Sequence, residues 1–97
     1  MYVDVMTSEF NSKTGRIIGR HYTLENARKN AYSELIRDFN PSNYVEIYDS
    51  KKSTGGSIGE LVGVVKCKPI YGHITWHPVS GGRWVLYKSG KLGERQL

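Results

Sequence analysis

The chain has 97 residues, a net charge of +5, 38% hydrophobic residues and 11 glycines. This length suits one domain, and the apolar content is that of a globular protein, which argues against a disordered chain. No apolar stretch approaches the ~20 residues that a membrane helix needs, and the first residues lack a signal-peptide pattern, so we expect a cytoplasmic protein with no membrane partner.

The N-terminal residues follow a pattern typical of a β-hairpin. Within residues 2–10, Val3 and Val5 fall on one side of an alternating strand. A polar segment follows and ends in Gly15, which can adopt the left-handed conformation that tight turns use. Residues 16–22 supply the return strand. The sequence therefore predicts an antiparallel pair of strands at the start of the chain.

An amphipathic helix is the clearest predicted element. Thr23 is a favourable N-cap, and Glu25 and Lys29 have the i,i+4 spacing of an ion pair on the helix surface. Because proline disfavours helical geometry at the preceding residue, we expect the helix to end at Asn40 and Pro41. An apolar stripe runs along it at spacings of three and four: Leu24, Ala27, Ala31, Tyr32, Leu35, Ile36 and Phe39. Such a helix packs its apolar face against another layer, here a sheet.

Four more strand segments follow the helix, separated by glycine and proline. They lie near residues 44–48, 61–67, 73–77 and 83–88. The polar, glycine-rich residues 49–59 indicate a loop, and the last four strands are expected to form a meander. The sequence predicts an α+β fold in which an antiparallel sheet of about five to six strands packs on one helix, in the order ββαββββ. We expect one domain over residues 1–97, with residues 89–97 forming a flexible tail.

Patterns that mark enzymes and metal sites are missing from the sequence. The chain has no phosphate-binding loop, no HExxH or CxxC motif and no GxSxG nucleophile elbow. Cys67 is the only cysteine, so no internal disulfide can form, and we expect a buried thiol. His73 and His77 would stand about 13 Å apart on a strand, too far for one metal ion with bonds of ~2 Å. We therefore expect no catalysis, no cofactor and no metal.

Positive charge gathers in the second half of the chain. Residues 50–97 contain eight basic and two acidic side chains, whereas residues 1–49 contain six and seven. This asymmetry favours an anionic partner, although a modest positive charge also serves solubility. The cations expected to contact such a partner are Lys51, Lys52, Arg83, Lys88 and Lys91.

The sheet face turned away from the helix is predicted to carry aromatic and polar side chains. Tyr44 and Tyr48 alternate with apolar residues and would point to that face. If Ile74 and Trp76 point toward the helix, Thr75 joins the outer face together with the two histidines. Aromatic side chains near cations can stack unpaired bases, which makes the two tyrosines candidate binding residues. High β-propensity alone also explains tyrosine and threonine at such positions.

Two functions remain open at the level of sequence. The first is a small non-catalytic protein-interaction or regulatory module that binds a protein partner, or another copy of itself, through a sheet edge. The second is a nucleic-acid-binding module that uses the basic C-terminal half and the exposed tyrosines. A stable stoichiometric protein complex would favour the first function, and steeply salt-dependent binding to anionic polymers would favour the second.

Overall fold

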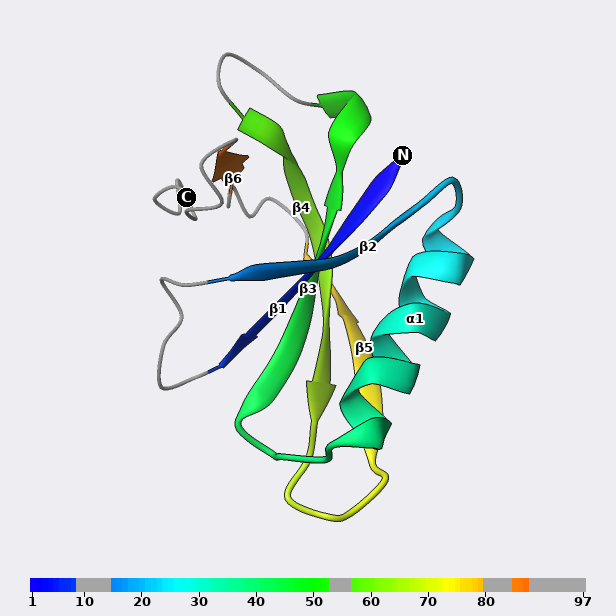
Figure 1. The fold of residues 1–97 in the computed structure, drawn as a ribbon, viewed down its shortest axis with the longest axis vertical. Helices are drawn as coiled ribbons and strands as arrows, with labels where there is room; N and C mark the ends of the chain where they lie inside the picture. Colours follow the sequence, from blue (N-terminus) through cyan, green and yellow to red (C-terminus); the bar gives the residue numbers. More distant parts are fainter. Residues whose placement is uncertain (9–14, 53–56, 80–84, 88–97) are drawn as a thin grey trace.

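The computed structural model describes residues 1–8, 15–52, 57–79 and 85–87, and one helix in it covers one face of an antiparallel sheet (Figure 1). The elements in chain order are β1 (Tyr2–Ser8), β2 (Arg16–His21), α1 (Leu24–Arg37), β3 (Asn43–Asp49), the 3-10 turn η2 (Ser50–Lys52), β4 (Ser57–Cys67), β5 (Ile74–Pro78) and β6 (Val85–Tyr87). The predicted α+β fold and the order ββαββββ are confirmed. The predicted tail lies outside the described residues, and no described helix is long and apolar enough to cross a membrane.

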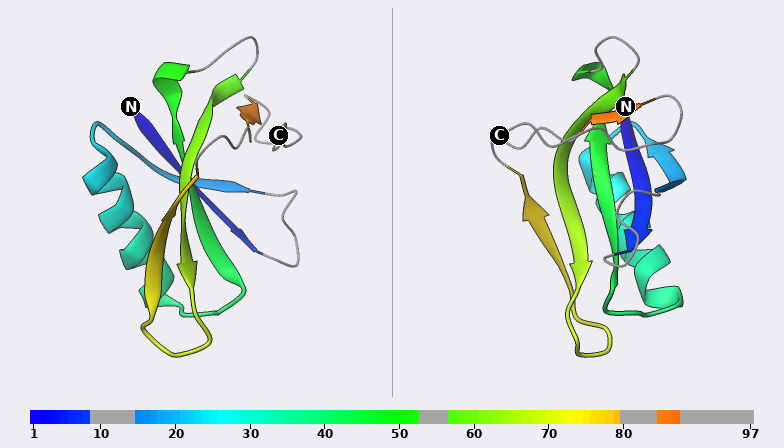
Figure 2. Two further views of the ribbon diagram at one scale, coloured as in Figure 1. Left: turned by 180° about the vertical axis from the view of Figure 1, so that it is seen from behind. Right: turned by 90° about the vertical axis from the view of Figure 1, so that its left-hand side faces the viewer.

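The sheet has the strand order β2-β1-β3-β4-β5, with every pair antiparallel (Figure 2). The strand β2 lies at one edge and β5 at the other. The short strand β6 pairs with β4 instead of β5, so the predicted meander is wrong at its last strand. The reason is the length of β4, which begins at Ser57 inside the predicted loop. Its first residues pair with β6 and its last ones with β5.

The helix α1 begins as predicted and ends earlier than predicted. The Asn26 N–H donates to Thr23 Oγ1 over 3.1 Å, which confirms Thr23 as the N-cap. At the other end, Asp38 leaves helical geometry with φ −136° and ψ 72°. A turn then follows, in which the Asn43 N–H donates to the Asn40 carbonyl over 2.9 Å. The helix therefore ends at Arg37, before the turn that contains Pro41.

Apolar side chains gather on both faces of the sheet. Between α1 and the sheet lie Ala27, Ala31, Leu35, Val45, Ile47, Val65 and Cys67, all buried. On the opposite face, a second cluster contains Val3, Val5, Tyr48 and Leu61. The two valines share one side of β1 as predicted, and that side is the one turned away from the helix. The second cluster means that the outer face is not simply a solvent-exposed surface.

Candidate functional site

Three of the seven predicted binding residues have described side chains. Lys51 is exposed on η2, where its N–H donates to Asp49 Oδ1 over 3.0 Å. Tyr44 is half-buried on β3. Lys52 belongs to η2, but its side chain lies outside the described part of the chain. Three more predicted residues, Arg83, Lys88 and Lys91, also lie outside it. The described residues therefore do not bring the predicted site together.

The expected exposure of Tyr48 is wrong. Its side chain points away from the helix as predicted but is 0% exposed, because it packs against Val3, Val5 and Leu61. Its O–H donates to Glu46 Oε2 over 3.3 Å, and burial together with the Glu46 charge raises the pKa of the phenol. Tyr48 is a core residue in this arrangement and offers no free ring face to a nucleic-acid base.

A groove of about 350 Å³ lies between α1 and the edge strand β5. Val65, Ile74 and Trp76 line it from the sheet, and both β5 residues point toward the helix. Arg28 and Tyr32 line it from α1. Tyr32 was assigned to the apolar stripe, yet its side chain is 47% exposed because it faces this groove. The result is a groove with aromatic, apolar and charged lining residues beside a sheet edge.

The indole ring of Trp76 is held in the groove from both sides. Gly63 lies on the neighbouring strand β4, where a Cβ atom would overlap the ring, so a glycine is required for this position of the indole. From the helix, the Arg28 guanidinium lies over the ring at 4.9 Å from its centroid. This distance suits a cation–π contact. The groove therefore presents a cation and an aromatic ring together.

The outer edge of β5 presents open backbone groups next to the groove. The Lys68 N–H donates to the His73 carbonyl over 2.8 Å, and the Val79 N–H donates to the Val62 carbonyl over 3.0 Å. Hydrogen-bonded positions of an antiparallel pair recur every second residue. The N–H and C=O groups of Ile74 and Trp76 therefore point away from β4. Among the described strands β5 pairs with β4 alone, which leaves these groups available to another strand.

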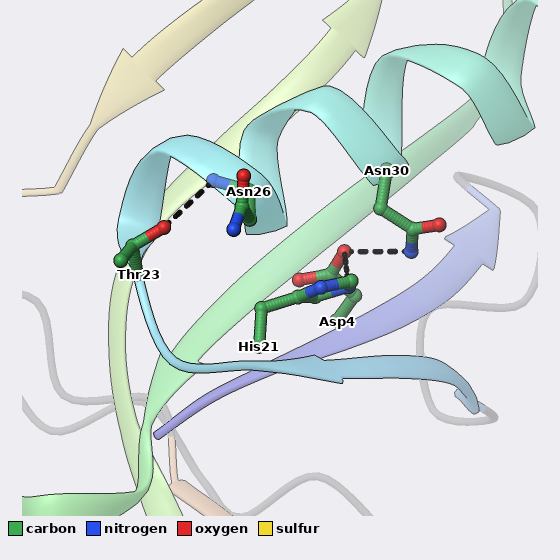
Figure 3. Close-up of polar contacts among 5 residues, drawn as sticks. All are labelled: Asp4, His21, Thr23, Asn26 and Asn30. Carbon is green, nitrogen blue, oxygen red and sulfur yellow. Dashed lines mark hydrogen bonds and ion pairs between the residues drawn. The ribbon is translucent and has the colours of Figure 1, made fainter.

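A buried polar cluster lies on the other side of α1, where the helix meets β1 and β2 (Figure 3). Asp4 is 0% exposed, and its Oδ2 accepts a hydrogen bond of 2.9 Å from Asn30 Nδ2 of the helix. His21 Nε2 lies 3.6 Å from the same oxygen. Gly19 makes room for both partners, since a Cβ there would lie 2.7 Å from His21 Nε2 and 2.9 Å from Asn30 Nδ2. The cluster fixes the helix to the first two strands.

The acidity of the Asp4 carboxyl is changed by its burial. Burial raises the pKa of its carboxyl to about 6, while the Asn30 hydrogen bond and the His21 charge oppose the shift. Its Oδ1 has no hydrogen-bond partner among the described residues. A carboxyl of this kind changes charge near neutral pH. Through its contacts with Asn30 and His21, Asp4 helps to hold α1 on the first two strands.

Cys67 is buried against α1, as the sequence predicted. Burial raises the pKa of its thiol, which lowers the thiolate fraction and hence the reactivity. In the part of the chain that the structure describes, no three His, Cys, Asp or Glu side chains gather in a way that could hold a metal ion.

Sequence analysis did not identify the groove residues Arg28, Tyr32 and Trp76 as a site. The sequence left open whether Trp76 points toward the helix, and the structure shows that it does. Its contact with Arg28 depends on the strand order, which brings β5 beside α1. The signal in the sequence was the position of Tyr32 at the margin of the apolar stripe, where the side chain is only partly covered.

Comparison of the chain with protein-family models, curated proteins and solved structures finds no match.

Proposed function

We propose that the protein is a small non-catalytic interaction module that binds an extended segment of a partner protein along the outer edge of β5. The observation that carries the proposal is that the backbone groups of Ile74 and Trp76 point away from β4, directly beside the groove, and pair with no other described strand. In strand addition, the main chain of the added segment supplies affinity, and pockets for alternate side chains supply specificity. Here the edge would supply the first and the groove the second.

The length and ending of β5 suit a short partner segment. Long, flat open edges promote uncontrolled pairing, which natural proteins limit with short edge strands and proline. The strand β5 has 5 residues and ends at Pro78, which has no N–H to offer. An added strand would therefore pair over a short, defined register. A single buried cysteine also suits a reducing compartment, so we place the proposed module in the cytoplasm.

Residue-resolved hydrogen exchange tests the proposed edge directly. In the free protein, the amides of Thr75 and His77 should exchange slowly, because they point toward β4, whereas those of Ile74 and Trp76 should exchange rapidly. A peptide selected from a random displayed library should slow exchange at Ile74 and Trp76 and leave Thr75 and His77 unchanged. NMR with and without the selected peptide gives this measurement.

A proline substitution at Ile74 supplies the matched test. Ile74 is the first residue of β5 and its N–H points outward, so proline should leave the β4 ladder intact while removing one donor. We expect Ile74→Pro to bind the peptide about tenfold or more weakly than Ile74→Ala, which loses the same packing but keeps the N–H. Equal affinity of the two variants contradicts the proposal. Binding of single-stranded oligonucleotides without binding of any peptide would also contradict the proposal, and it would favour a nucleic-acid-binding module.

A further inference from the structure

Arg28 is a groove cation without a carboxylate partner among the described residues. The ion pairs found there join Lys29 to Glu25, Arg37 to Glu34 and His21 to Asp4. The guanidinium of Arg28 instead lies over Trp76 and is exposed. A guanidinium stacked on a ring keeps its N–H groups directed outward, where they can donate to a carboxylate.

The other side of the β5 edge is also basic. Lys66 lies opposite Thr75 in the register of β4 and β5, and its side chain is exposed. His77 is exposed on β5, where its Nε2 lies 2.7 Å from Thr75 Oγ1. Lys68 follows at the end of β4 and is exposed as well. Glu25 and Lys29 also line the groove, where Lys29 Nζ lies 3.1 Å from Glu25 Oε1. The surroundings of the edge are therefore mainly positive on both sheet faces.

A strand added to β5 would present side chains to both of these basic surfaces. Such a strand lies about 4.8 Å from its neighbour, and its side chains point alternately to the two faces of the sheet. Those on the helix side would meet Trp76, Ile74 and Arg28, and those on the opposite side would lie near Lys66 and His77. An apolar side chain suits the ring of Trp76, and carboxylates suit the cations around it.

The same charges disfavour a second copy of this chain as the occupant. Pairing β5 with β5 of another copy would bring two sets of Arg28, Lys66 and Lys68 to one interface. Like charges across an interface oppose association, whereas opposite charges favour it and set the register. The complementary occupant is an acidic segment from a different protein.

We infer that the partner segment is an acidic extended peptide with an apolar or aromatic side chain beside Trp76 and a carboxylate on Arg28. This inference rests on the proposed function, because it names the chemistry of the segment that binds the β5 edge. It assigns Arg28 as the residue that distinguishes an acidic segment from other extended peptides.

Three peptides test the charge preference at constant shape. Each is acetylated and amidated, is long enough to pair with all of β5, and has a central tyrosine flanked by threonines. They differ only in whether the remaining positions are glutamate, glutamine or lysine. Fluorescence anisotropy should give the glutamate peptide an affinity about tenfold above that of the glutamine peptide, with the lysine peptide weakest. The preference should shrink between about 50 and 300 mM salt, because exposed charges are screened.

The substitution Arg28→Gln should remove most of this preference. We expect the glutamate peptide to bind about three- to tenfold more weakly and the glutamine peptide to bind as before. The matched control is Arg20→Gln on β2, an exposed arginine at the opposite edge of the sheet, which should change neither affinity. Equal effects of the two substitutions would overturn the assignment of Arg28.

The outcomes separate this inference from the function on which it rests. If all three peptides bind the β5 edge with equal affinity, the acidic preference is wrong and the strand-addition function stands. If no peptide from the displayed library slows hydrogen exchange at the amides of Ile74 and Trp76, the strand-addition function itself is wrong. Self-association that is detected by sedimentation velocity and abolished by Ile74→Pro would make a second copy of the chain the occupant and would overturn the inference.

Discussion

Replacing Leu35 with alanine is expected to lower the free energy of unfolding by about 2–5 kcal/mol. Leu35 is 1% exposed and belongs to the cluster between α1 and the sheet. Its removal leaves a cavity between the helix and β3, because the β-branched side chains of Val45 and Ile47 there cannot collapse fully into the space. The loss is large compared with the total stability of about 5–15 kcal/mol for a domain.

Urea denaturation followed by far-UV circular dichroism measures this loss. The midpoint should fall while the slope stays constant, since the surface exposed on unfolding changes little. Ser33→Ala is the matched control, because Ser33 lies on the exposed face of the same helix and acquires the same residue. It should stay within about 0.5 kcal/mol of the parent. A Leu35→Ala variant as stable as the control would show that α1 does not pack on the sheet through this face.

Local patterns predicted the helix and most strands, and they failed where glycine has a tertiary role. The segment that contains Gly59 reads as a loop, yet Gly59 lies within β4. A Cβ there would come 2.8 Å from the Asp49 carbonyl oxygen, so glycine permits a close approach of two backbones. Gly63 makes room for Trp76 in the part of β4 that was predicted correctly. In a single sequence, a glycine required by packing and a glycine required by a turn look the same.

The candidate site was harder to predict than the fold. The alternation of residues along β3 correctly predicted that Tyr48 points away from the helix, but whether that face is exposed depends on what covers it. Tyr48 lies opposite Val3 of the neighbouring strand β1, and the two side chains are buried together. The contact of Arg28 with Trp76 joins residues that only the sheet order brings together. Periodicity predicts the direction of a side chain, whereas burial and contacts depend on the arrangement of distant elements.

Ionisation of Asp4 is expected to reduce the stability of the protein as pH rises from about 4 to 6. The pKa of this carboxyl is raised from 3.8 to about 6, and burial is the largest cause. In that pH range the folded state holds a proton that the unfolded state has released, so the free energy of unfolding falls with increasing pH. The contribution is fully present below the unfolded value of 3.8 and is lost above about 6. A shift of this size corresponds to about 3 kcal/mol.

The substitution Asp4→Asn isolates this effect from the other carboxyl groups. An asparagine oxygen can still accept the hydrogen bond from Asn30 Nδ2, but the side chain does not ionise. Urea denaturation of parent and variant across this pH range should give a stability difference that moves by about 3 kcal/mol in favour of the variant as pH rises. Titration of exposed carboxyl groups cancels in the difference. A difference that stays constant with pH would show that Asp4 titrates equally in the folded and unfolded states.

A second variant tests the part that His21 has in this behaviour. His21 Nε2 lies 3.6 Å from Asp4 Oδ2, and the positive charge of the imidazole lowers the pKa of the carboxyl. His21→Gln removes that charge, so the pKa of Asp4 should rise further and the decline in stability should extend to higher pH than in the parent. The double variant with Asp4→Asn should lose this extension, because no ionising group remains at position 4. An unchanged decline in His21→Gln would mean that burial and the Asn30 hydrogen bond alone set the acidity of Asp4.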